Sequence, residues 1–484
     1  MIAAISWVPK GVSKSVPSAA DPPSKEEIEE MLKIGVLETR EESENEENDE
    51  NMNVGQNDEL SRALSAADAL GKGSKGETDS LADAIKELDM DNYDDEDEGA
   101  ELFGAPNLYY ASNKMDPYMK DQDDEDSEEE EDITIKPDDA VLVCARNEDD
   151  VSHLEVWIME NSTNGESNMY VHHDIVIPAF PLCTAWLDCP LKGGERGNFV
   201  AIGSMEPTIE IWDLDIIDEV QPSATLGGII EKKKKGKNKS IKYKEDSHTD
   251  AVLGLAWNKE YRNILASASA DKLVKVWDVA TEKCNLTLEN HTDKVQAVAW
   301  NNFAPQVLLS GSFDRSVVMK DGRVPSHSGF RWSVAADVES LAWDPHTEHS
   351  FVVSLENGTI TGFDIRNATS DPSAQPNPSF TIDAHDKAVC AIAYNSSVPN
   401  LLATGSMDKM VKLWDLSTQP SCIASKNPKA GAVFSISFSE DCPFTLAIGG
   451  STGKLQVWDL LSDAEVARKY AKYANQTKPT TPTP

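Results

Sequence analysis

The sequence predicts an all-β protein, a seven-bladed β-propeller with a long acidic insertion near its N-terminus. Aromatic markers recur at near-constant spacing, short β-branched runs alternate with turn residues, and most of the excess negative charge lies in one segment. The 484-residue chain carries 84 acidic and 44 basic residues, for a formal net charge of −40. Residues 1–137 hold 39 of these acidic and 12 of the basic residues. We therefore expect a patterned β domain joined to a segment without a core of its own.

We expect the N-terminal residues 1–11 to form a strand and residues 12–137 to be a largely disordered acidic insertion. Dense Asp and Glu blocks, such as residues 123–132, repel each other and oppose collapse. Two amphipathic stretches, 24–32 and 80–90, are predicted to be short helices, either transient or docking on a partner. Ser43 and Ser127 precede acidic residues and resemble acceptor sites of acidophilic kinases.

Residues 138–468 are assigned to the propeller because an internal repeat runs through them. Each copy has an inner-strand aromatic residue and a second marker about 20 residues later; the intervals are 26, 20, 19, 20, 20 and 20 residues. Successive copies mostly begin 43 to 51 residues apart, near the roughly 40–45 expected of a four-stranded blade. The marker pairs are Trp186 and Trp212, Trp257 and Trp277, Trp300 and Met319, Trp343 and Phe363, Tyr394 and Trp414, and Phe438 and Trp458.

One copy shows how the four strands of a blade are read from the sequence. Residues 251–257, 264–269, 273–277 and 284–288 are short apolar or β-branched runs separated by turn residues. A single sheet of this kind cannot bury both faces, whereas neighbouring blades around an axis cover them.

The seventh blade is predicted to be split by the acidic insertion. Residues 2–9 have the pattern of an inner strand ending near Trp7. Residues 140–145, 154–159 with Trp157, and 169–177 would supply the other three strands. The alternative is a free N-terminal tail with all blades formed downstream. We favour the split blade because it completes seven blades and explains an apolar N-terminus.

The blade ends and the histidines ahead of inner strands resemble WD repeats. In that family a His, a Ser or Thr, a turn Asp and the Trp form a hydrogen-bonded chain within a blade. The resemblance carries this chain onto His248, Ser267, Asp271 and Trp277, and onto His385, Thr404, Asp408 and Trp414. His291, Ser310 and Asp314 match as well, but Met319 replaces the Trp. Because such sets recur in several repeats, they indicate structure rather than a hydrolase triad.

The lysine-rich loop at residues 231–244 is the main functional candidate within the propeller. It holds eight lysines in 13 residues, among them Lys232, Lys233, Lys234, Lys235, Lys237 and Lys239. We expect nuclear targeting first and phosphate contact second; pairing with the acidic insertion is the structural alternative. Since no aromatic residues are interleaved for base stacking, RNA contact would be indirect or non-specific.

Several function classes are not expected from the sequence. No apolar run approaches the roughly 20 residues of a membrane span. The seven cysteines are odd in number and irregularly spaced, which favours a reducing compartment without disulfides or a zinc site. No nucleophile elbow, phosphate loop or dinucleotide fingerprint is present, so we expect no enzyme activity, no cofactor and no small-molecule substrate. Residues 469–484 are predicted to be a disordered tail.

Across nearly the whole chain, the sequence resembles the periodic tryptophan protein family, most closely its first member. The resemblance rests on the opening Ile-Ser-Trp-Val-Pro-Lys-Gly, the acidic insertion, the lysine-rich loop and the variant Val318-Met319-Lys320-Asp321. It implies a nuclear and nucleolar scaffold for ribosome biogenesis, chiefly of the large subunit, with roles in rRNA processing or rRNA-gene transcription.

The partners implied are pre-ribosomal assembly factors, ribosomal proteins or histones. Two alternatives remain at this point. One is a histone-binding chromatin factor. The other is a substrate receptor of a cullin-type ubiquitin ligase, because Phe363-Asp364-Ile365-Arg366 resembles the Trp-Asp-x-Arg box of such receptors.

Overall fold

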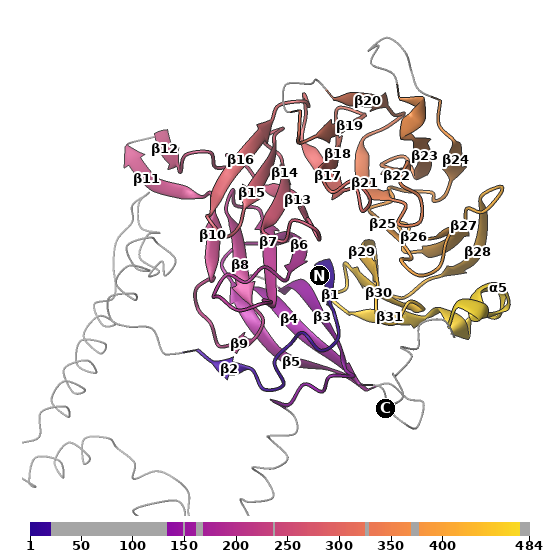
Figure 1. The fold of residues 1–484 in the computed structure, drawn as a ribbon, viewed down its shortest axis with the longest axis horizontal. Coiled ribbons are helices and arrows are strands. Elements are labelled where there is room, and N and C mark those ends of the chain that lie inside the picture. Colours follow the sequence, from indigo (N-terminus) through magenta and orange to yellow (C-terminus); the bar gives the residue numbers. More distant parts are fainter. Residues whose placement is uncertain are drawn as a thin grey trace, which may run out of the picture. The chain divides into compact units, whose positions relative to one another are not determined.

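The computed structural model describes seven β-sheets arranged as a ring (Figure 1). The described residues are 1–20, 133–148, 151–160, 168–235, 238–324, 329–368 and 377–474, without the side chains of residues 231–241. They all belong to one compact unit, made of residues 1–29 and 125–484. The prediction of a seven-bladed propeller is confirmed.

Six blades each contain four antiparallel strands, numbered here from the inner strand outward. Blade 1 contains β1 (Ile2–Val8), β3 (Ala140–Glu148), β4 (Val151–Glu160) and β5 (Asn168–Ile177). Blade 2 contains β6 (Pro181–Leu187), β7 (Phe199–Ser204), β8 (Ile209–Asp213) and β10 (Ala224–Leu226). Blade 3 contains β13 (Val252–Trp257), β14 (Ile264–Ser269), β15 (Val274–Asp278) and β16 (Lys283–Leu288). Blade 4 contains β17 (Val295–Trp300), β18 (Val307–Ser312), β19 (Ser316–Asp321) and β20 (Phe330–Ser333).

The remaining blades continue the same order. Blade 5 contains β21 (Val338–Trp343), β22 (Ser350–Leu355), β23 (Thr359–Asp364) and β24 (Phe380–Asp383). Blade 6 contains β25 (Ala391–Tyr394), β26 (Leu401–Gly405), β27 (Val411–Asp415) and β28 (Ser421–Lys426). In the described residues blade 7 has three strands, β29 (Val433–Phe438), β30 (Thr445–Gly450) and β31 (Gln456–Asp459).

The ring is closed by the N-terminal strand. Each inner strand contacts the inner strand of the next blade, and β1 contacts both β6 and β29. Strand β1 pairs with β3 in antiparallel register, with Trp7 opposite Leu142 and Val8 opposite Val141. The prediction that the first strand completes a split blade is therefore confirmed by strand pairing.

The core lies between the blades rather than within them. Strands two and three of blades 1 to 6 are buried along most of their length, because both faces of the sheet meet a neighbouring blade. The central strands are accordingly continuous apolar runs, such as Leu142 to Ala145. Trp212, Trp277, Trp332 and Phe351 are the largest fully buried side chains.

One predicted element and two predicted boundaries are wrong, and the first two of these concern the lysine-rich segment and the C-terminal tail. The segment 231–244 is a β-hairpin, β11 (Ile229–Lys235) and β12 (Asn238–Tyr243), rather than a loop, because its two lysine-rich halves pair with each other. The predicted tail starting at residue 469 begins inside helix α5 (Ala464–Ala474), which buries Val466 and Tyr470.

The limits 12–137 of the insertion also differ. Residues 12–20 and 133–137 lie on the propeller, where β2 (Ser18–Ala19) pairs in parallel with β9 (Ile216–Ile217). Ile135 is buried in the core cluster of blade 1. The two short helices expected at 24–32 and 80–90 lie outside the described residues, as do Ser43 and Ser127.

Candidate interaction site

Two blades contain the complete hydrogen-bonded chain expected of WD repeats. In blade 3, Nδ1 of His248 lies 2.8 Å from Oδ2 of Asp271, and Nε2 lies 2.7 Å from Oγ of Ser267. Trp277 donates its indole N–H to the same Oγ over 2.8 Å. In blade 6, His385 lies 2.8 Å from Asp408 and 2.8 Å from Thr404, and Trp414 donates to Thr404 over 3.0 Å. Each chain ties the turn between strands two and three to the preceding blade connection.

The protonation states follow from burial and from the direction of these bonds. An ionised carboxylate only accepts, so Nδ1 of His248 carries the proton and Nε2 accepts from Ser267. Burial lowers the pKa of His248 despite the nearby Asp271, so the imidazole is neutral. For Asp271, burial raises the pKa, but hydrogen bonds from His248, Thr249 and Leu273 outweigh it and leave a net decrease. A neutral histidine held in one tautomer is a structural link, and no open nucleophile results.

Blade 4 has a truncated chain with a different end. His291 lies 3.0 Å from Asp314 and 2.8 Å from Ser310, as in the complete chains. Met319 cannot donate where the other blades have Trp. On the other side, Ser316 donates to Asp314 over 2.6 Å, and Arg331 donates to Ser316 over 2.7 Å. Sequence analysis missed Ser316 and Arg331, because neither occupies a position that the repeat pattern marks.

The aromatic markers of the inner strands join neighbouring blades. Trp300 donates its indole N–H to the carbonyl of Ala256 over 3.1 Å, and Trp343 donates to Ala299 over 3.2 Å. Trp7 donates in the same way to Ser437, over 3.0 Å. Each acceptor precedes the inner-strand aromatic residue of the blade before it. The N-terminal strand therefore closes the ring with the same bond that joins two ordinary blades.

The other predicted markers make contacts of several kinds. Trp186 and Trp257 pack edge to face, with ring centroids 5.5 Å apart. Phe363 stacks on Phe351 and lies near Trp332, a buried residue that sequence analysis did not single out. The ring of Trp458 lies beneath Nζ of Lys426, 5.0 Å from the centroid. Trp157 donates to Glu155 and Trp212 donates to Glu210, both two residues earlier in the same strand.

The propeller has two ends that carry different appendages. Because the strands of a blade are antiparallel, the loop joining strands one and two lies at the end opposite the connection between blades. The acidic insertion joins β1 to β3, so it leaves from the first end, which we call the insertion face. The hairpin β11–β12 lies between the last strand of blade 2 and the first of blade 3. It therefore leaves from the opposite end, the hairpin face, and projects from the ring (Figure 1).

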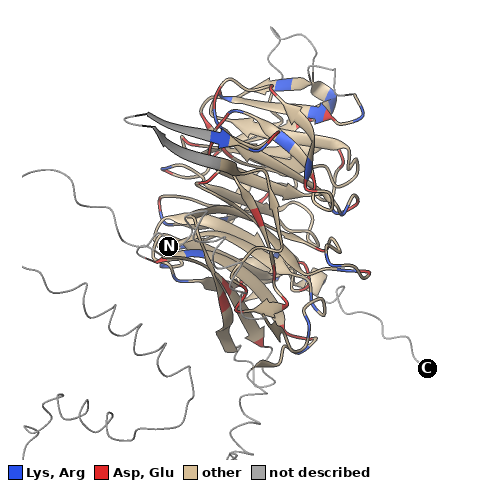
Figure 2. Cartoon of the chain, turned by 90° about the vertical axis from the view of Figure 1, so that its left-hand side faces the viewer, with Lys and Arg blue, Asp and Glu red and all other residues tan. Residues whose placement is uncertain are grey.

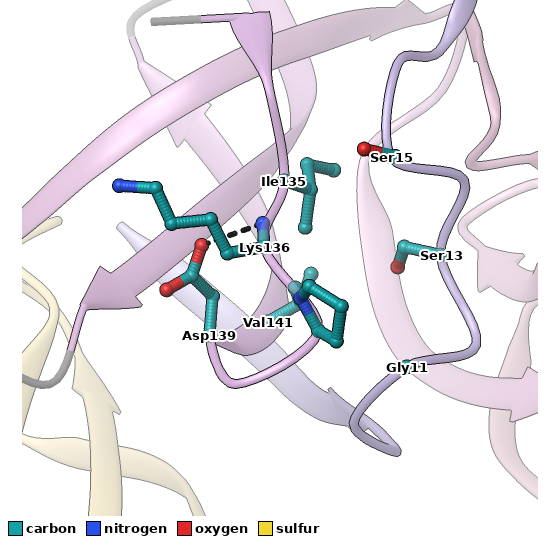
Figure 3. A pocket seen from close by; sticks show the side chains of 8 residues that line it. Gly11, Ser13, Ser15, Ile135, Lys136, Asp139 and Val141 are labelled. Atoms are coloured by element: carbon teal, nitrogen blue, oxygen red, sulfur yellow. Dashed lines mark hydrogen bonds between the residues drawn. The ribbon is translucent and has the colours of Figure 1, made fainter. Parts of the chain in front are cut away.

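Both ends of the insertion are fixed on the propeller. Ile135 donates its backbone N–H to the carbonyl of Ser15 over 2.7 Å, so the outgoing and returning chains run side by side. Figure 3 shows Gly11, Ser13 and Ser15 facing Ile135, Lys136 and Asp139 across a small pocket.

Blades 1 and 2 supply the side chains that hold the two ends of the insertion. Asn198 donates to Ser13 over 3.3 Å, and Asp215 accepts from the backbone N–H of Lys14 over 3.0 Å. His172 bonds to the carbonyl of Ile133 over 2.8 Å. The insertion is thus a closed loop on the insertion face.

The inner strands share an irregularity that the sequence pattern did not reveal. Six inner strands shift register at one residue near their start, which is typical of a β-bulge that re-aims a side chain. The bulged residues are Ala3, Leu182, Leu253, Gln296, Glu339 and Phe434. Burial raises the pKa of Glu339, and the nearby carboxylates of Glu356 and Asp337 raise it further.

The described residues offer little for metal or thiol chemistry. Within them, no three His, Cys, Asp or Glu side chains are grouped closely enough to hold a metal ion. All seven cysteines are free. Burial raises the pKa of Cys183 and of Cys390 to about 12, so neither thiol ionises readily at neutral pH.

None of the described helices has the length and apolar character needed to cross a membrane. Basic and acidic residues are both scattered over the blades in Figure 2.

Fold, hydrogen-bonded chains and blade markers together define a WD-repeat β-propeller. The family profile described as "WD domain, G-beta repeat" matches residues 239–278, 282–319 and 376–415. An uncharacterized WD repeat-containing protein of Schizosaccharomyces pombe is 37% identical over 89% of this chain and 83% of its own length. Periodic tryptophan protein 1 of Saccharomyces cerevisiae is 31% identical over 86% of this chain and 78% of its own length. A Drosophila melanogaster homolog of that protein is 29% identical over 69% of this chain and 68% of its own length. The chain belongs to the periodic tryptophan protein 1 family.

Proposed function

We propose that the protein is a non-enzymatic scaffold of ribosome biogenesis in the nucleus and nucleolus, acting in large-subunit assembly, rRNA processing or rRNA-gene transcription. The observation that carries this proposal is the placement of two oppositely charged appendages at opposite ends of one rigid propeller. The insertion returns to the ring beside its starting point, and the lysine-rich hairpin leaves from the other face.

The two appendages suit two chemically different partners. Acidic segments attract basic proteins such as ribosomal proteins or histones, and this attraction is screened by salt. Seven lysines lie in or between β11 and β12, and lysines neutralise phosphates without reading sequence. A pre-ribosomal particle presents both basic proteins and RNA phosphates. Membership of the periodic tryptophan protein 1 family supports the same assignment.

The decisive experiment is purification of the full-length protein from cells at moderate salt. Pre-ribosomal proteins together with rRNA precursors are expected. A yield dominated by core histones would instead support a chromatin factor, and ligase adaptors would support a substrate receptor. The matched variants replace Lys232, Lys233, Lys234, Lys235, Lys237 and Lys239 with Gln or, as a charge-preserving control, with Arg. Nucleolar signal and rRNA recovery should fall only in the Gln variant; equal behaviour of both variants would remove the role of the hairpin.

A substrate receptor is retained as the second candidate because of one structural observation. Arg366 donates to both carboxylate oxygens of Asp364, and its side chain is 68% exposed. The neighbouring blade repeats the arrangement with Arg323 on Asp321, 66% exposed. If the protein is a substrate receptor, replacing both arginines with Glu should abolish recovery of ligase adaptors. If it is a scaffold of ribosome biogenesis, the same replacement should leave recovery of rRNA precursors unchanged.

A further inference from the structure

The seventh blade presents an open strand edge. Among the described residues it has only β29, β30 and β31, whereas the other six blades have four strands each. Strand β31 pairs with β30 on one side, and no described strand pairs with its outer edge. After Asp459 the chain turns into a 3-10 helix, η3 (Leu460–Ser462), and then into α5, which lies against β28 of blade 6 (Figure 1). The place of a fourth strand is therefore vacant in this part of the chain.

In the other blades the fourth strand covers an aromatic residue of the next blade. Trp212 shares a core cluster with Ile175 and Ile177 of β5, and Trp277 shares one with Leu226 of β10. The same holds for Phe363 with Trp332 of β20, Trp414 with Ile382 of β24, and Trp458 with Ala424 of β28. These five aromatic side chains are 1, 1, 3, 6 and 4% exposed. A fourth strand thus completes the core of the following blade.

The vacancy leaves blade 1 incompletely covered. Trp157 occupies the equivalent position in blade 1, but it is only half-buried, and so is Met169 on the neighbouring strand. The cluster between blades 7 and 1 has six buried residues, fewer than any other between described blades. Both side chains therefore form an apolar shelf beside the open edge of β31.

We propose that the outer edge of β31 receives an extended segment of a partner protein as the fourth strand of blade 7. Backbone hydrogen bonds to β31 would supply affinity, as in other cases of strand addition to a sheet edge. An apolar side chain at alternating positions of the segment would cover Trp157 and Met169. The partner segment is thus uncharged on its inward face, like Phe380 and Ile382 in β24.

The C-terminal end of this chain is a poor candidate for the same place. Residues 475–484 contain three prolines and no aliphatic or aromatic side chain. Proline lacks the N–H group that a strand needs for pairing, and Thr and Lys would not cover Trp157. We therefore assign the place to a segment of another protein rather than to residues 475–484.

The test uses amide hydrogen exchange of the purified full-length protein. The probe is a synthetic peptide with the sequence of residues 377–386, which contains the fourth strand of blade 5. With the peptide at millimolar concentration, the alternate amides of Gln456 to Asp459 that face the open edge, and do not bond to β30, should exchange about tenfold more slowly. A paired ladder amide exchanges only when the strand opens. A peptide with Lys at the position of Ile382 is the matched control and should protect weakly or not at all.

Two protein variants locate the binding. Met169→Lys places a charge on the shelf and should abolish protection, whereas Met205→Lys, at an exposed position of blade 2, should preserve it. Unchanged exchange at β31 with saturating peptide would overturn the proposal. So would strong protection without peptide that disappears when residues 21–132 are replaced by a linker, since the occupant would then be the protein itself. Protection that rises with protein concentration alone would point to a second copy and overturn it likewise. None of these outcomes depends on the proposed role in ribosome biogenesis.

Discussion

Blades 3 and 1 reach the same four-stranded sheet by different routes. Blade 3 takes its strands from one stretch, Val252 to Leu288, and locks them with the chain from His248 to Trp277. Blade 1 takes its inner strand from the N-terminus and the rest from beyond residue 139. Its described residues form no histidine chain like that of blade 3, yet Trp7 makes the same bond to the preceding blade that Trp300 and Trp343 make. The difference shows that the bonds between blades, rather than chain continuity, define the ring.

Removing residues 1–11 should have the largest effect. The deletion exposes the partners of Ile2, Ile5 and Val8, which are buried. At about 1.5–3 kcal/mol for each buried aliphatic side chain, the loss is comparable with the whole stability of a typical domain. We expect an insoluble or unfolded protein, judged by expression and thermal melting. A soluble protein with an unchanged melting temperature would show that β1 is dispensable.

The matched control replaces residues 21–132 with a short Gly/Ser linker. This keeps β1, and it keeps the contact between Ser15 and Ile135 that fixes both ends of the insertion. The melting temperature should match that of the full-length protein, because no described core residue is removed. A large decrease would mean that the insertion contributes to the core.

Breaking the hydrogen-bonded chain of blade 3 should cause the next largest loss in the free energy of unfolding. His248→Ala removes one buried hydrogen-bond partner from Asp271 and one from Ser267, for about 2–4 kcal/mol. His291→Ala should cost less, because Ser316 still donates to Asp314. Urea denaturation measures both; an equal or larger loss in blade 4 would contradict this ranking.

Acidification should weaken blade 1 before it protonates the carboxylates of blade 3. Burial, and then repulsion from His172, lowers the pKa of His173 to about 4, with Asp174 opposing the shift. Because the folded pKa lies below the unfolded value of 6.5, the unfolded state binds more protons between those values. This contribution is complete above pH 6.5 and is lost as the pH falls toward 4, by at most about 3 kcal/mol.

The urea midpoint at each pH reports this loss, and His173→Gln should flatten its slope between pH 6.5 and 4. His248 and His385 act in the same direction, since their pKa values are also lowered by burial. The lowered pKa values of Asp271 and Asp408 matter only below about pH 4. An unchanged slope in the variant would contradict the assignment to His173.

Trp7→Phe should have the smallest effect. The substitution keeps most of the packing and removes only the indole N–H that donates to Ser437, for about 1 kcal/mol. Trp300→Phe and Trp343→Phe are the matched controls, because they remove the corresponding bonds between contiguous blades. Chemical denaturation should give three similar losses; a negligible loss for Trp7 alone would show that the first strand is held differently.

The sequence predicts those parts of the fold that repeat. Constant marker spacing predicted the repeated blades and the four strands of blade 3, because each blade solves the same packing problem. The resemblance to WD repeats predicted the hydrogen-bonded chains around His248 and His385. The split blade was also readable, since residues 2–9 end in the aromatic residue that inner strands share. Other parts depend on contacts that no local pattern encodes. The lysine-rich run has little intrinsic preference for a strand, and its hairpin depends on pairing of its two halves.

Helix α5 and the missing fourth strand of blade 7 are two features that the sequence-based prediction did not include, for different reasons. The helix had a readable signal, because Asp463 accepts from the N–H of Glu465, and Val466, Tyr470 and Ala474 are spaced four residues apart. The missing strand of blade 7 had none, since no residue marks the absence of a partner. Likewise, Trp157 has the same local sequence setting as buried markers, and only the neighbouring blade determines its exposure.

The closed base of the insertion has a consequence for proteolysis. Since Ser15 and Ile135 meet on the propeller and β1 lies within a sheet, a single cut between residues 20 and 133 separates the chain without removing a strand. The N-terminal fragment would remain bound as the inner strand of blade 1. The nicked molecule would then behave as a split protein, whose two pieces could be exchanged or recombined while the ring stays whole.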